Sequence, residues 1–391
     1  MPFLSQCGCI KDILVTEEEL IDRFVGHQLW AWGRMGIACG VGDNTTIVRS
    51  SPVQTISGGT NWKDIKAGSE HIAAIKTDGT LWLWGHDVLG NNSTIRRSSP
   101  VQTISGGTNW RSIGGGANWV HAIKTDGTLW SWGSNGQGKL GNNLQDSVNE
   151  TLSPVQTIAG GTNWLRVARG GCQHSAAIKT DGTLWLWGRG QVGRLGNNAT
   201  TDRSSPVQTI SGGTNWKSAS IGRYNSAATK TDGTLWLWGG GYCGALGNNS
   251  TANQSSPVQT VSGGANWRSV ALAECMTAAI KTDGSLWTWG LGDLGRLGNN
   301  STTNRSSPVQ TISGGTNWRA VDAKLFGGVA IKTDGTLWGW GSGYRGALGN
   351  NINQGSTAGS SSPVQTISGG TNWRRVAAAA SVTAALCVTE F

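Results

Sequence analysis

Residues 176–188 read Ala-Ala-Ile-Lys-Thr-Asp-Gly-Thr-Leu-Trp-Leu-Trp-Gly. Its Asp-Gly pair is a strong two-residue hairpin turn, because both central positions of such a turn need positive φ. After the turn, Trp185 and Trp187 lie two residues apart and share one face of a strand, while Leu184 and Leu186 take the other. Both faces are apolar, as expected for a sheet that packs between two neighbouring sheets.

The hairpin belongs to a unit that recurs along the chain. The string L-W-x-W-G begins at Leu29, Leu81, Leu129, Leu184, Leu235, Leu286 and Leu337. The strings S-P-V-Q-T and N-W recur with it at a period of about 51 residues, which is typical of propeller blades and solenoids. These strings hold 21 of the 22 tryptophans and leave only Trp119 outside the repeat.

Spacing within the unit separates framework from loop. The distance from S-P to the N-W tryptophan is 11 residues in every copy, and from there to L-W-x-W-G it is 19 or 20. From W-G to the next S-P it varies from 14 to 21, which marks a surface loop. We expect four strands per unit: P-V-Q-T-I, the stretch after N-W, A-A-I-K-T and T-L-W-L-W-G. Seven such units predict an all-β, seven-bladed β-propeller.

The two ends of the repeat array predict ring closure. The strand at Leu29 lacks a hairpin partner before it, and residues 384–391 occupy the place of A-A-I-K-T-D-G with no fourth strand after them. We expect residues Leu386 to Thr389 to pair with Leu29 through Trp32. This pairing would complete the seventh blade and remove two sheet edges.

The first 28 residues differ in composition from the propeller, which covers residues 29–391. They hold two basic and five acidic residues, and residues 16–19 form a capping box with Val15 and Leu20 as a hydrophobic staple. We predict an N-terminal arm with a short amphipathic helix that ends near Gly26. This helix either covers the propeller or docks onto a partner.

The repeat resembles that of the regulator of chromosome condensation family. Residues 171–188 match the family's G-x-x-H-[ST]-x-A-[IL] and D-G-x-[LV]-[WY]-x-W-G segments, and residues 193–196 match its G-x-L-G. His71 and His121 are expected at the site of His174. Kelch repeats have a similar period but lack D-G-x-L-W-x-W-G. The motif S-P-V-Q-T-x-x-G-G-x-N-W is most similar to repeats of family members encoded by bacteria and tailed bacteriophages.

The sequence offers no catalytic constellation, and we expect a protein that is not an enzyme and needs no metal or cofactor. The three histidines above fit structural roles, and the repeated aspartates are turn residues. No phosphate-cradling or nucleophile-elbow motif is present, and the seven cysteines include no C-x-x-C pair. We also expect cytoplasmic synthesis without a signal peptide, and no membrane insertion, because no run approaches about 20 apolar residues.

The charge pattern favours protein partners. The net charge is +9, and the W-G to S-P loops hold eleven basic and six acidic residues. Nucleic-acid binding is disfavoured, because it usually shows denser basic clusters interleaved with exposed aromatics. The partners we expect are virion proteins or a host surface component.

Two functional hypotheses follow. The first is a virion structural or attachment component of a bacteriophage, located in the virion, with variable loops on a rigid ring. The second, implied by the resemblance, is an intracellular interaction regulator that binds a small GTPase or chromatin. The residues after each W-G differ in every copy, through partner contact or through drift of unconstrained loops. The predicted partner-binding residues are His86, Arg189, Tyr242, Tyr344 and Arg345.

Overall fold

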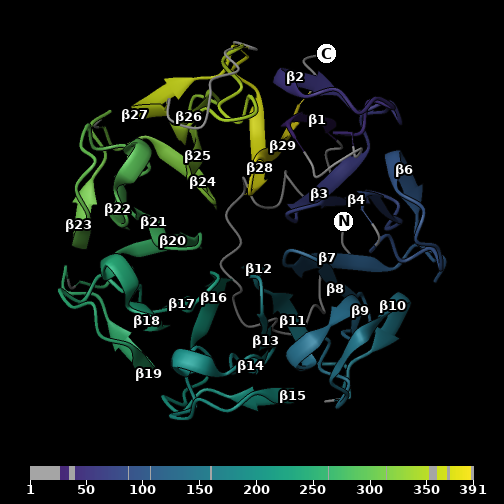
Figure 1. Ribbon diagram of the computed structural model, residues 1–391, viewed down its shortest axis with the longest axis horizontal. Helices are drawn as coiled ribbons and strands as arrows, with labels where there is room; N and C mark the ends of the chain where they lie inside the picture. The colour runs from purple at the N-terminus through teal and green to yellow at the C-terminus, as the bar shows by residue number, and fades with distance from the viewer. Residues whose placement is uncertain are drawn as a thin grey trace, which may run out of the picture.

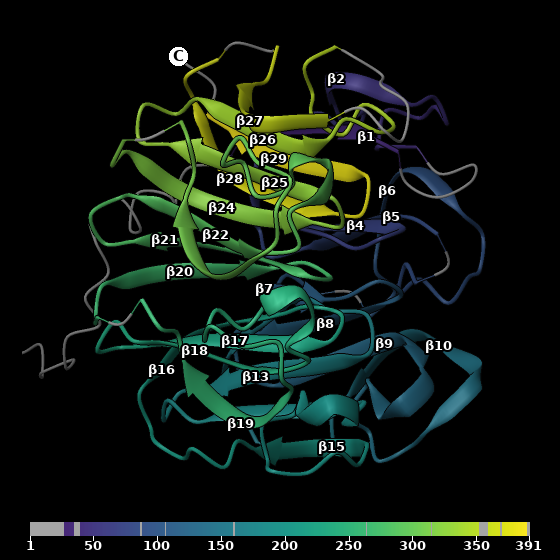
Figure 2. The ribbon, with the colours of Figure 1, turned by 60° about the vertical axis from the view of Figure 1, so that its left-hand side comes forward.

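The computed structural model describes residues 27–34, 40–86, 88–105, 107–158, 161–262, 264–313, 315–351, 359–367 and 370–388. Across these residues the strands form seven blades around a central axis, and the chain runs once round the ring (Figure 1). In the view turned by 60° about the vertical axis, the strands labelled β28 (Trp373–Ala379), β24 (Trp318–Lys324), β20 (Trp267–Leu272) and β16 (Trp216–Ile221) lie one below another (Figure 2). The prediction of an all-β propeller is confirmed.

Each blade is a four-stranded antiparallel sheet, whose strands follow one another from the axis outward. Blade 1 consists of β3 (Trp62–Ala67), β4 (His71–Lys76), β5 (Leu81–Gly85) and β6 (Arg97–Gln102). Blade 2 consists of β7 (Trp110–Gly115), β8 (Trp119–Lys124), β9 (Leu129–Asn135) and β10 (Asp146–Gln156). Blade 3 consists of β11 (Trp164–Val167), β13 (His174–Lys179), β14 (Leu184–Gly188) and β15 (Arg203–Gln208).

The remaining blades repeat this order. Blade 4 consists of β16 (Trp216–Ile221), β17 (Asn225–Lys230), β18 (Leu235–Gly239) and β19 (Gln254–Gln259). Blade 5 consists of β20 (Trp267–Leu272), β21 (Met276–Lys281), β22 (Leu286–Gly290) and β23 (Arg305–Gln310). Blade 6 consists of β24 (Trp318–Lys324), β25 (Gly327–Lys332), β26 (Leu337–Ser342) and β27 (Gly359–Gln365). Blade 7 consists of β28 (Trp373–Ala379), β29 (Val382–Cys387), β1 (Gln28–Gly33) and β2 (Arg49–Gln54).

Blade 3 contains the one copy whose interval from N-W to L-W is 20 residues. The two-residue strand β12 (Arg169–Gly170) follows β11 there. It pairs in parallel with β7 of blade 2 and β16 of blade 4. The longer interval is therefore used near the axis, where it joins three blades by backbone hydrogen bonds.

The S-P-V-Q strand belongs to a different blade from the one expected. It is the outermost strand of the blade whose L-W-x-W-G precedes it, as β6 pairs with β5. It also ends at the glutamine rather than at the following Thr-Ile. The segment through G-G-T-N-W then carries the chain inward to the next blade.

Blade 7 confirms that the terminal strands pair, but with a different register. β1 and β29 are antiparallel, and Leu29 lies opposite Leu386 while Trp32 lies opposite Thr383. The expected partner segment, Leu386 to Thr389, was therefore misplaced by three residues, and Thr389 lies outside the described residues. The arm predicted over residues 1–28 lies outside them as well, except that His27 bridges Trp62 and Gln28 begins β1.

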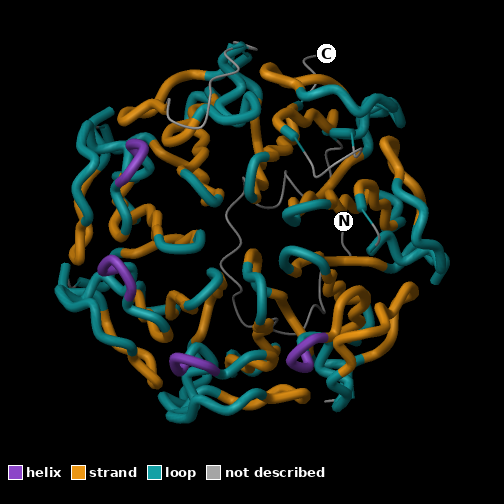
Figure 3. Tube along the Cα trace, in the orientation of Figure 1, coloured by secondary structure: helices purple, strands orange, loops and turns teal. Residues whose placement is uncertain are grey.

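Neighbouring blades are clamped by the second tryptophan of each L-W-x-W-G. Trp238 is fully buried, and its Nε1 donates to the carbonyl of Arg194 in the preceding blade at 2.9 Å. It packs on Gly196, whose φ is +67° and where a Cβ would lie 2.7 Å from that Nε1. Single 3-10 turns lead into four of these clamps (Figure 3): η1 (Gly136–Gly138), η2 (Gln191–Gly193), η3 (Tyr242–Gly244) and η4 (Asp293–Gly295). No helix among the described residues is long and apolar enough to cross a membrane.

The first tryptophan of the same motif is only half-buried, so of the two tryptophans that share one face of the strand only the second is enclosed between blades. Trp236 donates through Nε1 to Thr234 Oγ1 at 2.9 Å, and Lys230 lies 4.7 Å from its ring. Asp232 binds the amide and the hydroxyl of Thr234 rather than the lysine. The Thr234 hydrogen bonds lower the pKa of Asp232 from its usual value.

The buried histidines join blades to one another. His174 Nε2 lies 2.8 Å from Ser226 Oγ, which donates to the same Arg194 carbonyl that Trp238 binds. In blade 2, however, the residue opposite Gly133 is Trp119, whereas His71 and His174 lie opposite Gly85 and Gly188. The expectation that His121 shares their site is therefore wrong.

His121 takes part in a related network two residues further along β8. Its Nε2 lies 2.7 Å from Ser175 Oγ of blade 3, and Trp119 Nε1 donates to it at 3.1 Å. Burial lowers the pKa of His121 to about 3 and that of His71 to about 4. Both imidazoles are thus neutral parts of the framework at neutral pH.

Removing tryptophans of the two kinds should have unequal effects. We expect Trp238→Ala to lower the free energy of unfolding by about 3–5 kcal/mol, the range for truncating a buried large aromatic. Trp236→Ala should cost clearly less, because its ring is already half in water. Urea unfolding of both variants measures the difference. Equal losses in the free energy of unfolding would contradict the conclusion that the second tryptophan holds neighbouring blades together.

The substitution His71→Asn should reduce acid sensitivity, since Asn225 already holds the equivalent position in blade 4. In the unfolded chain His71 binds a proton below its pKa of 6.5, whereas in the folded protein it binds one only below about pH 4. The free energy of unfolding therefore falls as the pH is lowered from 6.5 to 4. The variant should lose about 3 kcal/mol less than the wild type between pH 7 and pH 4. Urea unfolding of both proteins at both pH values measures this difference. An equal loss of stability in the variant and the wild type would contradict the prediction.

Candidate functional site

The turns between the first and second strands of the blades lie around the central axis (Figure 3). Residues of all seven turns line a cavity of about 260 Å³. Much of the lining is glycine and alanine, including Gly68, Gly116, Gly222 and Ala273. A Cβ on Gly68 would lie 2.3 Å from the His71 ring and 2.7 Å from the Gly116 carbonyl oxygen. A residue without a side chain is therefore required at Gly68, where these two turns meet.

Polar and aromatic side chains stand on one side of this cavity, and we call Arg223, Tyr224, Tyr242 and Glu274 the rim cluster. Arg223 and Glu274 line the cavity and form an ion pair with an N–O distance of 2.6 Å. The Arg223 guanidinium lies 5.2 Å from the Tyr224 ring. Tyr242 packs edge-on against Tyr224 at 5.3 Å and is 44% exposed. The cluster thus combines a charge pair with two tyrosines at the edge of a hollow.

Arg194 holds the rim cluster from below. Its side chain is buried, and Nη1 donates to the Arg223 carbonyl at 2.7 Å and to Gln173 Oε1 at 2.9 Å. Its guanidinium also lies 5.6 Å from the Tyr224 ring. Burial lowers the pKa of Arg194 to about 10, which leaves it charged at neutral pH. The turn carrying Arg223 and Tyr224 is therefore fixed to the framework.

The predicted partner-binding residues are distributed over four blades, each between the third and fourth strands. Tyr242 belongs to the rim cluster, while His86 Nδ1 lies 3.8 Å from Glu70 Oε2 in blade 1. Arg189 is half-buried in blade 3, and in blade 6 the Arg345 guanidinium lies 4.7 Å from the Tyr344 ring. The structure does not gather these five residues into one site, because equivalent positions on separate blades lie apart around the ring.

Sequence reasoning missed Arg223, Tyr224 and Glu274, which the inner turns supply. A signal was present, because these turns differ in every copy. The seven segments read Gly-Ser-Glu at 68–70, Gly-Ala-Asn at 116–118, Gly-Cys-Gln at 171–173, Gly-Arg-Tyr at 222–224, Ala-Glu-Cys at 273–275, Lys-Leu-Phe at 324–326 and Ala-Ala-Ser at 379–381.

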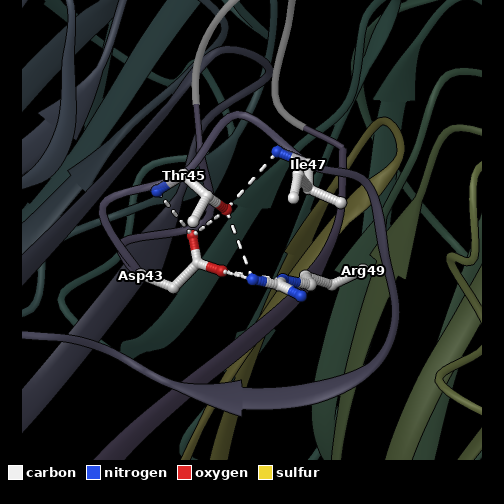
Figure 4. A network of polar contacts seen from close by, with 4 residues as sticks. All are labelled: Asp43, Thr45, Ile47 and Arg49. Atoms are coloured by element: carbon white, nitrogen blue, oxygen red, sulfur yellow. Dashed lines mark hydrogen bonds and ion pairs between the residues drawn. The ribbon is translucent and has the colours of Figure 1, made fainter.

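Part of the positive charge in the outer loops is neutralised locally. Asp43 accepts from Arg49 Nε at 2.7 Å and from the amide and hydroxyl of Thr45 at 3.1 and 2.9 Å (Figure 4). Arg296 pairs with Asp293 in the same way in blade 5. Two of the eleven basic side chains in these loops are therefore paired within the chain and are not free to bind a partner's carboxylates.

Titratable groups near the cavity are held in neutral or structural states. Burial raises the pKa of the Cys172 thiol above its usual value and that of Cys275 to about 11. Lys324, which lines the cavity, donates to the Ala347 carbonyl at 2.7 Å, and burial lowers its pKa to about 7. Among the described residues, no three His, Cys, Asp or Glu side chains are placed to hold a metal ion.

Sequence comparison shows that the chain is similar to several known proteins. The chain is 27% identical over 339 residues to the ultraviolet-B receptor UVR8 of Arabidopsis thaliana, covering 82% of this chain and 61% of the receptor. It is 28% identical over 214 residues to the human E3 ubiquitin-protein ligase HERC2, covering 51% of this chain and 4% of the ligase. The chain thus spans less than two thirds of these relatives.

Solved structures show the same fold. The crystal structure of Prp20p from Saccharomyces cerevisiae, described with its binding to Gsp1p and histones, superposes with a TM-score of 0.81 at 18% identity over 96% of each chain. The model of the regulator of chromosome condensation repeat matches residues 126–178, 181–229, 283–324 and 334–386, just over half of the chain. The protein belongs to the regulator of chromosome condensation repeat family, and its fold is the propeller of the solved structure above.

Proposed function

We propose that this propeller is a non-enzymatic scaffold that binds a protein partner at the rim cluster and the adjoining cavity. The observation that carries the proposal is Tyr242, exposed and packed on Tyr224 beside the Arg223–Glu274 pair. Tyrosine and arginine are among the residues that dominate binding energy at protein interfaces. Because Arg194 fixes the turn beneath them, these side chains lose little freedom on binding.

The chemistry of the surroundings supports binding rather than catalysis. The thiols of Cys172 and Cys275 have raised pKa values, and the rings of His121 and His174 are buried with lowered pKa values. A cysteine nucleophile would need a lowered pKa, and a histidine general base would need a pKa near neutral. Lys324 has a pKa lowered to about 7, but its ammonium group is buried and donates to the Ala347 carbonyl.

The relatives favour an intracellular regulator over a virion component. Prp20p is described as binding Gsp1p and histones, and another solved structure shows yeast RCC1 bound to Kap60. The relatives above come from a plant, a mammal and a yeast, so they lend no support to a bacteriophage origin. We therefore propose that the protein acts inside the cell, with a small GTPase or a histone as its partner class.

The proposal is tested with purified Gsp1p and with core histones, by isothermal titration calorimetry. We expect wild-type protein to bind one of these probes and Tyr242→Ala to weaken that binding at least about 30-fold, the effect of losing a hot-spot residue worth roughly 2 kcal/mol. Arg223→Glu should weaken binding similarly.

The matched control is Tyr344→Ala, which removes the same residue type from the equivalent loop of blade 6 and should leave affinity unchanged. Equal weakening by Tyr242→Ala and Tyr344→Ala would shift the interface to the outer loops. Absence of binding to both probes would overturn the assigned partner class. Thermal melting confirms that each variant is folded.

A further inference from the structure

Six blades share an aromatic site that is filled by a lysine of their own. The lysine before each Asp-Gly turn lies over the ring of the inner-strand tryptophan and over that of the first tryptophan in L-W-x-W-G. These lysines are Lys76, Lys124, Lys179, Lys230, Lys281 and Lys332, with Nζ 4.2–5.0 Å from the ring centroids. These distances fall within the range of favourable cation–π contacts.

Blade 7 keeps the two tryptophans and lacks the lysine. Trp30 and Trp373 meet edge-on at 6.3 Å and 79°, as Trp318 and Trp338 do in blade 6 at 6.3 Å and 80°. Cys387 lies opposite Trp373 in the register that places Lys332 opposite Trp318. The ring pair therefore holds its geometry without a cation from this position.

The thiol of Cys387 does not substitute for the missing ammonium group. Its side chain ends one atom beyond Cβ, whereas a lysine carries three further methylenes and the charged nitrogen. Burial raises the pKa of Cys387 to about 11, so it is neutral. No described cation lies over Trp30 or Trp373 within cation–π distance.

The rest of the site is arranged for a polar group. Gln28 Oε1 accepts from Trp30 Nε1 at 3.3 Å and lies 3.8 Å from Cys387 Sγ, which places a carbonyl oxygen beside the rings. Trp30 is half-buried, and so are the six lysines in the other blades, so this position borders solvent. Where those blades have an Asp-Gly turn, blade 7 has separate chain segments, with β1 beginning at Gln28 and β29 ending at Cys387.

We propose that Trp30 and Trp373 form a binding site for a primary alkylammonium group, supplied by a lysine side chain of a protein partner. The ligand class follows from the six other blades, where the same ring pair takes the side chain of a lysine. The site lies at the end of the blade opposite the cavity and the rim cluster, because Trp373 begins β28 while Ala378 and Ala379 at its other end line the cavity. It is independent of the function proposed above.

Nuclear magnetic resonance of the full chain with ¹⁵N-labelled tryptophan tests the site. The Trp30 indole signal is assigned with Trp30→Phe and followed during titration with n-butylammonium chloride at constant ionic strength. We expect a saturable shift with this probe and none with n-butanol, its uncharged analogue. No shift, or an equal shift with n-butanol, would overturn the proposal.

Two variants serve as matched controls. Cys387→Lys should supply the missing cation, abolish the response of Trp30 to butylammonium and raise the melting temperature. Lys332→Cys should open the equivalent site in blade 6, so that the Trp338 signal becomes responsive. A Trp30 response that persists in Cys387→Lys, or an unresponsive Trp338 in Lys332→Cys, would refute the equivalence of the blades.

Two further arms identify the source of the cation. A short peptide with one lysine should reproduce the butylammonium shift. The same peptide with norleucine in place of the lysine should not. If the lysine peptide gives no shift, the assignment of the cation to a protein side chain is wrong. The variant Lys11→Ala/Arg23→Ala should leave the Trp30 signal of the free protein in place. A change there would show that the chain fills its own site, which would overturn an external partner.

Discussion

Contact between the second tryptophan of each blade and a glycine of the preceding blade holds the ring together. The indole covers the glycine, and in five of these contacts its N–H binds the carbonyl two residues before that glycine. A side chain at the glycine would displace the indole, and its positive φ would be costly for another residue. The same contact closes the ring, since Gly349 meets Trp32 and Gly42 meets Trp84. All other packing operates within this constraint.

Most of the fold can be predicted from the sequence, because the contact between tryptophan and glycine requires the same residues at the same spacing in every blade. The tryptophans, the Asp-Gly turns and the number of copies predict seven blades, and the unmatched terminal strands predict closure. It is harder to predict which four strands form one blade, because a tandem repeat can be divided into units at any point without changing its pattern. The register of β1 and β29 was also misjudged, since no hairpin turn fixes it.

The histidine position shows how an available signal was overlooked. His71 and His174 each precede the next Leu-Trp by ten residues, whereas His121 precedes it by eight, and Trp119 is the residue ten before. Strand pairing follows this count from the hairpin rather than the identity of the side chain. Trp119, the one tryptophan outside the repeat strings, thereby takes a framework position, and His121 joins a hydrogen-bond network that only the fold reveals.

The geometry of a ring also explains why the candidate site differs from the predicted one. Loops at the outer strands lie on the circumference, so variable residues there belong to separate surfaces, as His86, Arg189 and Tyr344 do. Turns at the inner strands converge on the axis, and residues from several blades meet there, as Arg223 of blade 4 and Glu274 of blade 5 do. A surface built from many copies of one repeat is therefore assembled most readily at the axis. Tyr242 joins it because Tyr224 links its loop to the inner turn.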